Sequence, residues 1–249
     1  MLIDAHAHMD YEQFEKDLDK VITSAEENNF VAIISNGTGP ASNRKVLELS
    51  KKYNIIKPAL GIYPIEALEM SDEEIDEEIE FIKKSNPLAI GEVGIDYYHT
   101  DVKEKQKINF IKFIKLSKEL NIPIIVHSRN AEEDVVQILE EEGAKKVLMH
   151  CFSSGKKELA ERIEKNGWYF SIPATIVRNK TFKKLVKRIS MDRILTETDA
   201  PFLSPFKEKR NEPSFIKETI KKIAEIKQLT EKEVEDQIYS NYKRLFSNE

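Results

Sequence analysis

The stretch that decides the fold is Leu2-Ile-Asp-Ala-His-Ala-His-Met-Asp10, at the start of a chain of 249 residues. Its apolar opening predicts a buried strand. Successive side chains of a strand point to opposite faces, so Asp4, His6 and His8 share one face. Two imidazoles side by side at a strand end can hold one metal ion in common. A His-x-His pair alone is weak evidence, but the chain has only five histidines, so the positions of the other three matter.

Strand-like and helix-like segments alternate along the rest of the chain. After the opening strand, short apolar runs predict strands at residues 30–35, 55–60, 88–92, 123–127, 146–150, 168–172 and 193–198. Amphipathic spacing predicts helices over residues 14–28, 71–85, 108–120, 131–142, 156–166, 179–189, 214–226 and 231–245, with one more that ends near residue 52. Ser71 with Glu74 three residues later predicts a capping box at one helix start.

This alternation implies a parallel sheet with right-handed crossovers. Eight strand-helix units in 249 residues fit a closed (β/α)8 TIM barrel better than an open doubly wound sheet. No linker rich in Gly, Pro or Ser divides the chain. We therefore expect a single α/β domain over residues 1–249, with extra helices at the C-terminus.

Polar residues that can bind metals follow the apolar runs at corresponding positions. In this kind of barrel functional side chains gather at the C-terminal ends of the strands. One histidine after one strand is more often a structural residue, but here four histidines and two carboxylates take such positions. The set predicts a metal site formed by His6, His8, Glu92, His127, His150 and Asp199.

Six ligands exceed the need of one tetrahedral ion, which favours two divalent ions bridged by a carboxylate. We expect Glu92 to be the bridge, with His6, His8 and Asp199 on one ion and His127 and His150 on the other. Two divalent cations less two carboxylates leave a surplus of positive charge, which suits an anionic substrate such as a phosphodiester. The residues leave Mg²⁺, Mn²⁺ and Zn²⁺ open.

Several neighbours of these residues are predicted to lie at the same C-terminal end of the barrel, which we call its mouth. Arg129 could grip a phosphate in a bidentate manner or form a salt bridge at a helix start. Asp4, Glu197 and Asp96 share the parity of ligand positions, and we expect them to orient imidazoles or metal-bound water. The loops after the last two strands carry further basic residues, which are Arg178, Lys180, Lys207, Lys209 and Arg210. Nearby aromatic side chains could stack on bases or pack in the protein interior, and these are Tyr97, Tyr98, Phe202 and Phe206. The cations Lys183, Lys184, Lys187 and Arg188 repeat along a helix and predict a solvated face.

Composition and missing motifs exclude several classes of function. The net charge of −5 gives the whole molecule no general attraction for nucleic acid or anionic membranes. A single cysteine, Cys151, excludes an internal disulfide and fits a reducing compartment. No leader, membrane-length apolar run or glycine-rich nucleotide motif is apparent, so we expect a cytoplasmic protein without a nucleotide cofactor and, as the simplest state, a monomer.

The motifs together resemble the TatD-type metal-dependent deoxyribonucleases. The stretches that carry the resemblance are Asp4 to Asp10, Ile90-Gly-Glu-Val-Gly-Ile-Asp-Tyr-Tyr98, His127-Ser-Arg129, His150-Cys-Phe-Ser153, Glu197-Thr-Asp-Ala-Pro201, Asn211-Glu-Pro213 and Asn241 with Leu245-Phe246. The resemblance spans essentially the whole chain. It implies a (β/α)8 barrel, a two-metal site and hydrolysis of DNA phosphodiesters, often as a 3′-5′ exonuclease on single-stranded or frayed ends.

The chain departs from the pattern of that family at two places. The family commonly has a histidine after the third strand, whereas Gly61-Ile-Tyr-Pro-Ile65 has none and places Tyr63 there. We expect this change to remove a phosphate contact. The loop Ser153-Ser-Gly155 is shifted from the usual Ser-Gly, which is a smaller difference.

In this reading Asp199 is the expected proton acceptor for the attacking water, with Glu92 as the second choice. An alternative within the hydrolases is cleavage of an amide or ester, such as an aminoacyl ester or a cyclic amide. Barrel enzymes of that kind often bridge their metals with a modified lysine, and Glu92 holds that place here. A catalytically idle scaffold is the third possibility, against which the complete ligand set argues.

Overall fold

The computed structural model describes residues 1–247, so the last two positions of the expected domain lie outside the described residues. Eight parallel strands form one sheet in the order β1-β2-β3-β4-β5-β6-β7-β8. Their bounds are Leu2–Ala7 (β1), Phe30–Asn36 (β2), Ile56–Leu60 (β3), Ala89–Asp96 (β4), Ile124–Arg129 (β5), Val147–Met149 (β6), Tyr169–Pro173 (β7) and Ile194–Glu197 (β8). The sequence-based prediction of eight strands in chain order is confirmed.

The sheet closes on itself between β1 and the residues that follow β8. Ala7 pairs with Ala200 in a parallel bridge. The backbone N–H of Asp199 donates to His6 O at 2.8 Å, and the N–H of His8 donates to Ala200 O at 2.7 Å. The predicted (β/α)8 barrel is therefore the observed fold, and its closure brings the first strand beside the last.

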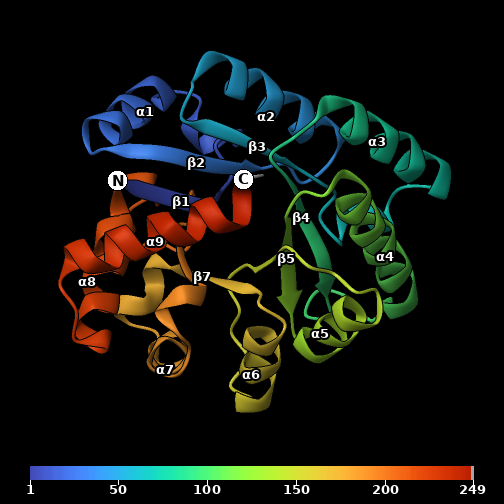
Figure 1. Cartoon of the computed structure of the whole chain (residues 1–249). Helices are drawn as coiled ribbons and strands as arrows, with labels where there is room; N and C mark the ends of the chain where they lie inside the picture. Colours follow the sequence, from blue (N-terminus) through green and yellow to red (C-terminus); the bar gives the residue numbers. More distant parts are fainter. Residues whose placement is uncertain (248–249) are drawn as a thin grey trace.

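Helices surround the barrel in chain order, as Figure 1 shows for α1 to α8. Their bounds are Leu18–Glu27 (α1), Pro40–Lys52 (α2), Asp72–Ser85 (α3), Lys103–Leu120 (α4), Glu132–Glu141 (α5), Lys157–Lys165 (α6), Lys180–Arg188 (α7), Ile216–Lys227 (α8) and Glu231–Phe246 (α9). Each turns an apolar stripe to the strands, because a surface helix of a barrel buries one face only. The capping box of Ser71 and Glu74 is present at the start of α3, as predicted.

The last helix, α9, lies across the end of the barrel at which the strands begin. The buried side-chain amide of Asn241 donates to the carbonyl groups of Met191 and Ile194, at 2.7 and 2.8 Å, where β8 starts. Figure 1 shows α9 crossing in front of the barrel. The opposite end, where the strands finish, is left to loops. No helix within residues 1–247 has the length and apolar character needed to span a membrane.

Candidate metal centre

The six predicted donors meet at the C-terminal end of the barrel, although three of them do not stand where the sequence placed them. His127 lies within β5, because Ser128 and Arg129 continue to pair with β4. Glu92 lies within β4 and not at its end, because Val93 to Asp96 continue to pair with β5. Asp199 follows β8, which ends two residues earlier at Glu197. These side chains still face the mouth of the barrel, since barrel strands are tilted and end at different levels along the barrel axis.

Four donor atoms form the first group. His6 Nε2 lies 3.2 Å from His8 Nε2, 3.4 Å from Glu92 Oε2 and 3.5 Å from Asp199 Oδ1. His8 Nε2 lies 3.3 Å from the same Glu92 oxygen and 3.4 Å from the same Asp199 oxygen. These five distances lie between 3.2 and 3.5 Å, which suits donor atoms that share one ion at about 2.1 Å, the bond length of Zn²⁺ to nitrogen and oxygen. This donor set therefore fits a divalent ion.

The second group uses the other oxygen of the same carboxylate. Glu92 Oε1 lies 2.9 Å from His127 Nδ1 and 3.8 Å from His150 Nε2. The ring of His150 stacks on that of His6 with centroids 3.6 Å apart, so the two groups are adjacent. Glu92 thus presents one oxygen to each group. A carboxylate in this position can bridge two neighbouring cations.

Hydrogen bonds at the far side of three imidazoles fix which nitrogen faces the cluster. His8 Nδ1 lies 2.9 Å from Asn36 O, and His150 Nδ1 lies 2.7 Å from Glu197 Oε2. His127 Nε2 lies 3.0 Å from Asp96 Oδ2. Each acceptor requires an N–H, so a neutral ring presents the lone pair of its other nitrogen to the cluster.

The three carboxylates predicted to orient the site differ in what they touch. Asp96 and Glu197 each accept from an imidazole of the cluster, as described above. Asp4 instead accepts from the backbone N–H of Thr198 at 2.9 Å and its hydroxyl at 2.5 Å, and from the N–H of His6 at 3.3 Å. It contacts the backbone of the site and joins β1 to the chain after β8. Within the described residues, Nδ1 of His6 has no hydrogen-bond partner.

The electrostatics of the cluster favour positive charge. Burial raises the pKa of Glu92, but His6, His127 and His8 outweigh it and hold that pKa well below its usual range. Burial opposes ionisation of Asp199 too, and His8, His150 and His6 bring its pKa below the ordinary value. His127 has a pKa of about 9, because its bonds to Asp96 and Glu92 outweigh the effect of burial. The carboxylates of Glu92 and Asp199 are therefore ionised and attract cations.

Two contacts of the site were not foreseen. The Tyr63 hydroxyl donates to Asp96 Oδ2 at 2.8 Å, and so reaches the carboxylate that holds His127. The backbone N–H of Cys151 donates to Glu197 Oε1 at 3.0 Å. The sequence did single out Tyr63 as a departure from the family pattern, but the acceptor lies 33 residues away. The partner of the Cys151 amide is 46 residues away and has no local signal.

A cavity of about 610 Å³ opens beside the cluster. Its lining includes His127, His150 and Asp199, together with Arg129 at the end of β5 and Arg178 from the loop after β7. The Arg129 guanidinium also lies 3.9 Å from the centre of the Tyr98 ring. This cavity can therefore receive an anionic group next to the candidate metal ligands.

Four other cations predicted at this end of the barrel do not line the cavity. Arg210 pairs with Asp17 at 2.7 Å and donates to Gln13 O, which places it against the start of α1. Lys207, Lys209 and Lys180 do not line the cavity. Asp17 belongs to the connection between β1 and α1, at the same end of the barrel as the cluster, so Arg210 lies at that end but is paired with a carboxylate and does not line the cavity.

Comparison with known proteins decides the family. The family model described as TatD related DNase matches residues 3–247. The chain belongs to this family. The metal-dependent hydrolase YabD of Bacillus subtilis is 41% identical to this TatD chain, with 99% of each chain covered. Human deoxyribonuclease TATDN3 is 36% identical over 98% of this chain and 94% of its own length.

Solved structures agree with the family membership. The crystal structure of YjjV, a TatD homologue from Escherichia coli K12, superposes with a TM-score of 0.92 and 26% identity, covering 100% of this chain and 98% of the other. The resemblance inferred from the motifs is thereby confirmed. The protein is a metal-dependent hydrolase of the TatD family, with a candidate His/Glu/Asp metal-binding cluster.

Proposed function

We propose that this TatD-family hydrolase cleaves phosphodiester bonds of DNA at a two-metal site. The observation that carries the proposal is the position of Glu92, whose two oxygens face two separate groups of nitrogen and oxygen donors. Two neighbouring cations are typical of enzymes that act on phosphate esters. The relative named deoxyribonuclease TATDN3 supports DNA as the substrate.

The two ions would be held by residues of this chain already placed around Glu92. One ion would have His6, His8 and Asp199, and the other His127 and His150, with Glu92 common to both. Imidazole nitrogen predominates among these donors, which favours Zn²⁺ over Mg²⁺. When bound, such ions activate a water molecule and neutralise the charge that develops on the phosphate.

Asp199 is best placed to take the proton of the attacking water. Its side chain is 16% exposed, more than those of His8 and Glu92, at 4% and 5%, and it lines the cavity through which water enters. Its carboxylate is ionised, as a proton acceptor has to be. Glu92 is enclosed by the histidines and has no free oxygen, which makes it the second choice.

Arg129 and Arg178 would bind the phosphate groups of the strand. Both line the cavity, and a guanidinium can bind phosphate oxygens in a bidentate manner. The cavity suits a single nucleotide and its phosphate better than a base-paired duplex, which supports single-stranded DNA or frayed ends as the substrate. Digestion in the 3′-5′ direction is part of the proposal, on the resemblance to the family.

Assay of the purified protein on end-labelled single-stranded DNA, with Mg²⁺, Mn²⁺ or Zn²⁺ added, tests this function. We expect stepwise shortening from the 3′ end, and loss of turnover in Asp199→Asn with an unchanged circular dichroism spectrum. Aryl phosphodiesters and aminoacyl esters in parallel reactions separate the phosphodiesterase from an ester hydrolase. Faster cleavage of the aminoacyl ester than of any phosphodiester would overturn the proposal.

A further inference from the structure

The helix α7 carries an unusual concentration of positive charge. Its nine residues, Lys180-Thr-Phe-Lys-Lys-Leu-Val-Lys-Arg188, include five cations and no acidic residue. Phe182, Leu185 and Val186 are buried against the barrel. The cations therefore lie on the outer face, as the sequence pattern predicted.

Three of these cations lack the carboxylate partners that some lysines of other helices have. Lys112 and Lys232, for example, pair with Asp76 and Asp236 on the protein surface. Lys184, Lys187 and Arg188 are exposed and make no ion pair or side-chain hydrogen bond within residues 1–247. Because the whole chain has a net charge of −5, an uncompensated basic face of this kind is a local feature that selects for polyanions.

This face is continuous with the mouth of the barrel. A groove of about 120 Å³ runs between α6 and α7, lined among others by Ser154, Gly155, Lys184 and Arg188. Ser153, the preceding residue of the same loop, lines the cavity beside the metal centre. The loop between β6 and α6 thus has the metal centre on one side and the basic groove on the other.

Arg178 links the two regions. It precedes α7, lines the metal-centre cavity and donates to Pro205 O at 2.8 Å, which anchors it between the loops after β7 and β8. From Arg178 the cations continue along α7 for about 12 Å, the length of eight residues of helix. That length covers roughly two or three consecutive phosphates of a nucleic-acid strand.

We propose that the α6–α7 groove and the outer face of α7 bind the sugar–phosphate backbone of a single DNA strand whose scissile bond lies at the metal centre. This proposal rests on the proposed function and adds a binding track outside the mouth. The groove is too small for a duplex, and its cations contact phosphates without reading bases. The proposal predicts that the affinity of the protein for single-stranded DNA increases with strand length, since a dinucleotide bound at the metal centre cannot reach Arg188.

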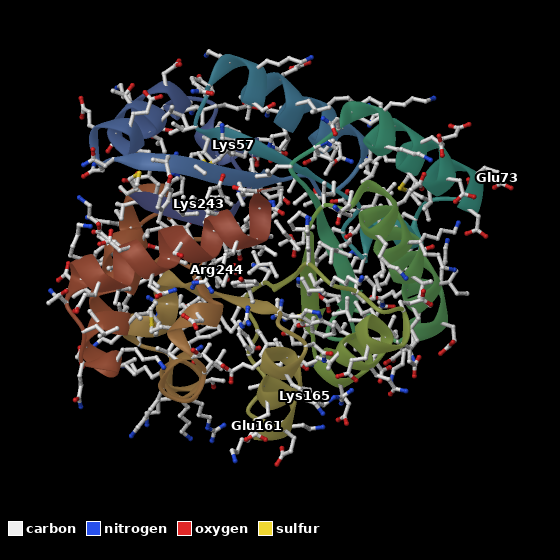
Figure 2. All side chains as sticks on the ribbon, in the orientation of Figure 1. Lys57, Glu73, Glu161, Lys165, Lys243 and Arg244 are labelled. Atoms are coloured by element: carbon white, nitrogen blue, oxygen red, sulfur yellow. The ribbon has the colours of Figure 1, made fainter. Side chains whose placement is uncertain are left out.

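Two double variants provide a matched test. Lys187→Gln/Arg188→Gln changes an adjacent Lys-Arg pair in the last turn of α7, and Lys243→Gln/Arg244→Gln changes the same kind of pair in the last turn of α9. Figure 2 labels Lys243 and Arg244 on α9, at the barrel end opposite the mouth. Both pairs are exposed, so neither change should disturb folding.

The measurement is the KM for thymidine oligonucleotides from dT2 to dT12, with binding of a fluorescein-labelled phosphorothioate dT12 followed by anisotropy. We expect the α7 variant to raise the KM for dT12, and the Kd of the labelled probe, about tenfold at low salt. The slope of log Kd against log salt should fall by about 1.4, since each single-strand phosphate contact contributes roughly 0.7. Adding Lys184→Gln should enlarge both effects.

The control variant on α9 should leave all these values unchanged. Equal KM and Kd values for the α7 variant and the wild type would overturn the track while leaving the proposed function intact, provided dT2 and dT12 are both cleaved. If no oligonucleotide is cleaved, the proposed function fails, and the anisotropy comparison still decides whether α7 binds the strand. Equal increases of KM and Kd in the α7 and α9 variants would show a general effect of charge and would also overturn the proposal.

Discussion

Nε2 of His127 lies 3.0 Å from Oδ2 of Asp96, and this bond turns Nδ1 of the same ring towards Glu92. Asp96 is fully buried and also accepts from the backbone N–H of Tyr98 at 2.8 Å. Burial raises the pKa of Asp96, but its hydrogen bonds with the side chains of His127, His99 and Tyr63 outweigh burial and bring that pKa well below its usual range. The orientation of His127 therefore depends on how firmly Asp96 is held.

Tyr63→Phe tests that dependence. The change removes only the hydroxyl that donates to Asp96 at 2.8 Å, so the packing of the ring is kept. Loss of a bond of this kind behind a metal ligand lowers metal affinity by about 10-fold or more, and we expect a loss of that size for one of two ions. Competition with a fluorescent chelator measures it.

Tyr97→Phe is the matched control, because the Tyr97 hydroxyl donates to Asp134 at 2.7 Å and not to a carboxylate of the cluster. We expect it to keep the affinity of the wild type. Equal affinities for Tyr63→Phe and the wild type would mean that the phenol does not position His127.

Glu92→Gln should reduce the number of bound ions. The amide keeps one oxygen that can bind a metal, while its NH₂ group cannot, so only one donor group remains complete. We expect elemental analysis after dialysis to find about one bound ion per chain in place of about two, and we expect turnover to be lost with the second ion. Glu66→Gln changes a carboxylate outside the donor groups and should retain both ions. Two tightly held ions in Glu92→Gln would contradict the bridging role.

Removal of the metals should lower thermal stability as well as activity. An ion that binds only the folded chain stabilises it by about 2.7 kcal/mol when present at 100 times its Kd. For a chain of this size that corresponds to an increase of roughly 5 to 10 °C in Tm. Differential scanning fluorimetry of chelator-treated protein, with and without added Zn²⁺ or Mn²⁺, measures the change. The same Tm in both samples would show that no ion binds the native state.

The parts of the structure that could be predicted from the sequence depend on short-range patterns. Ser71 and Glu74 are three residues apart and form their capping box without help from the rest of the chain. His6 and His8 share a face because of strand periodicity alone. The convergence of Glu92 and Asp199 on them followed from the barrel, since all its strands finish at one end.

The remaining features depend on contacts between distant residues. Nothing near Tyr63 in the sequence reveals that its hydroxyl meets Asp96, and the parity of Asp4 did not show that it would bond to Thr198 and not to an imidazole. The sequence predicts Arg210 at the C-terminal end of the barrel, but not that it pairs with Asp17, 193 residues away at the start of α1. Hydrophobic periodicity predicts helices and strands, but it does not predict which side chains of distant segments will contact each other in the folded protein.

Asn241→Ala should destabilise the fold without changing the metal centre. The side-chain amide is fully buried and satisfies two carbonyl groups at the start of β8. Its removal leaves those acceptors unpaired and opens a small cavity, at a cost of about 2 to 4 kcal/mol. Urea unfolding measures this loss of stability. Gln237→Ala is the control, because it removes a single, partly exposed hydrogen bond to Asn241. We expect it to lower the free energy of unfolding by less than about 1 kcal/mol. Because α9 lies at the barrel end opposite the mouth, metal affinity should match the wild type in both variants. A fall in metal affinity in Asn241→Ala at temperatures where the variant remains folded would show that the two ends of the barrel are coupled.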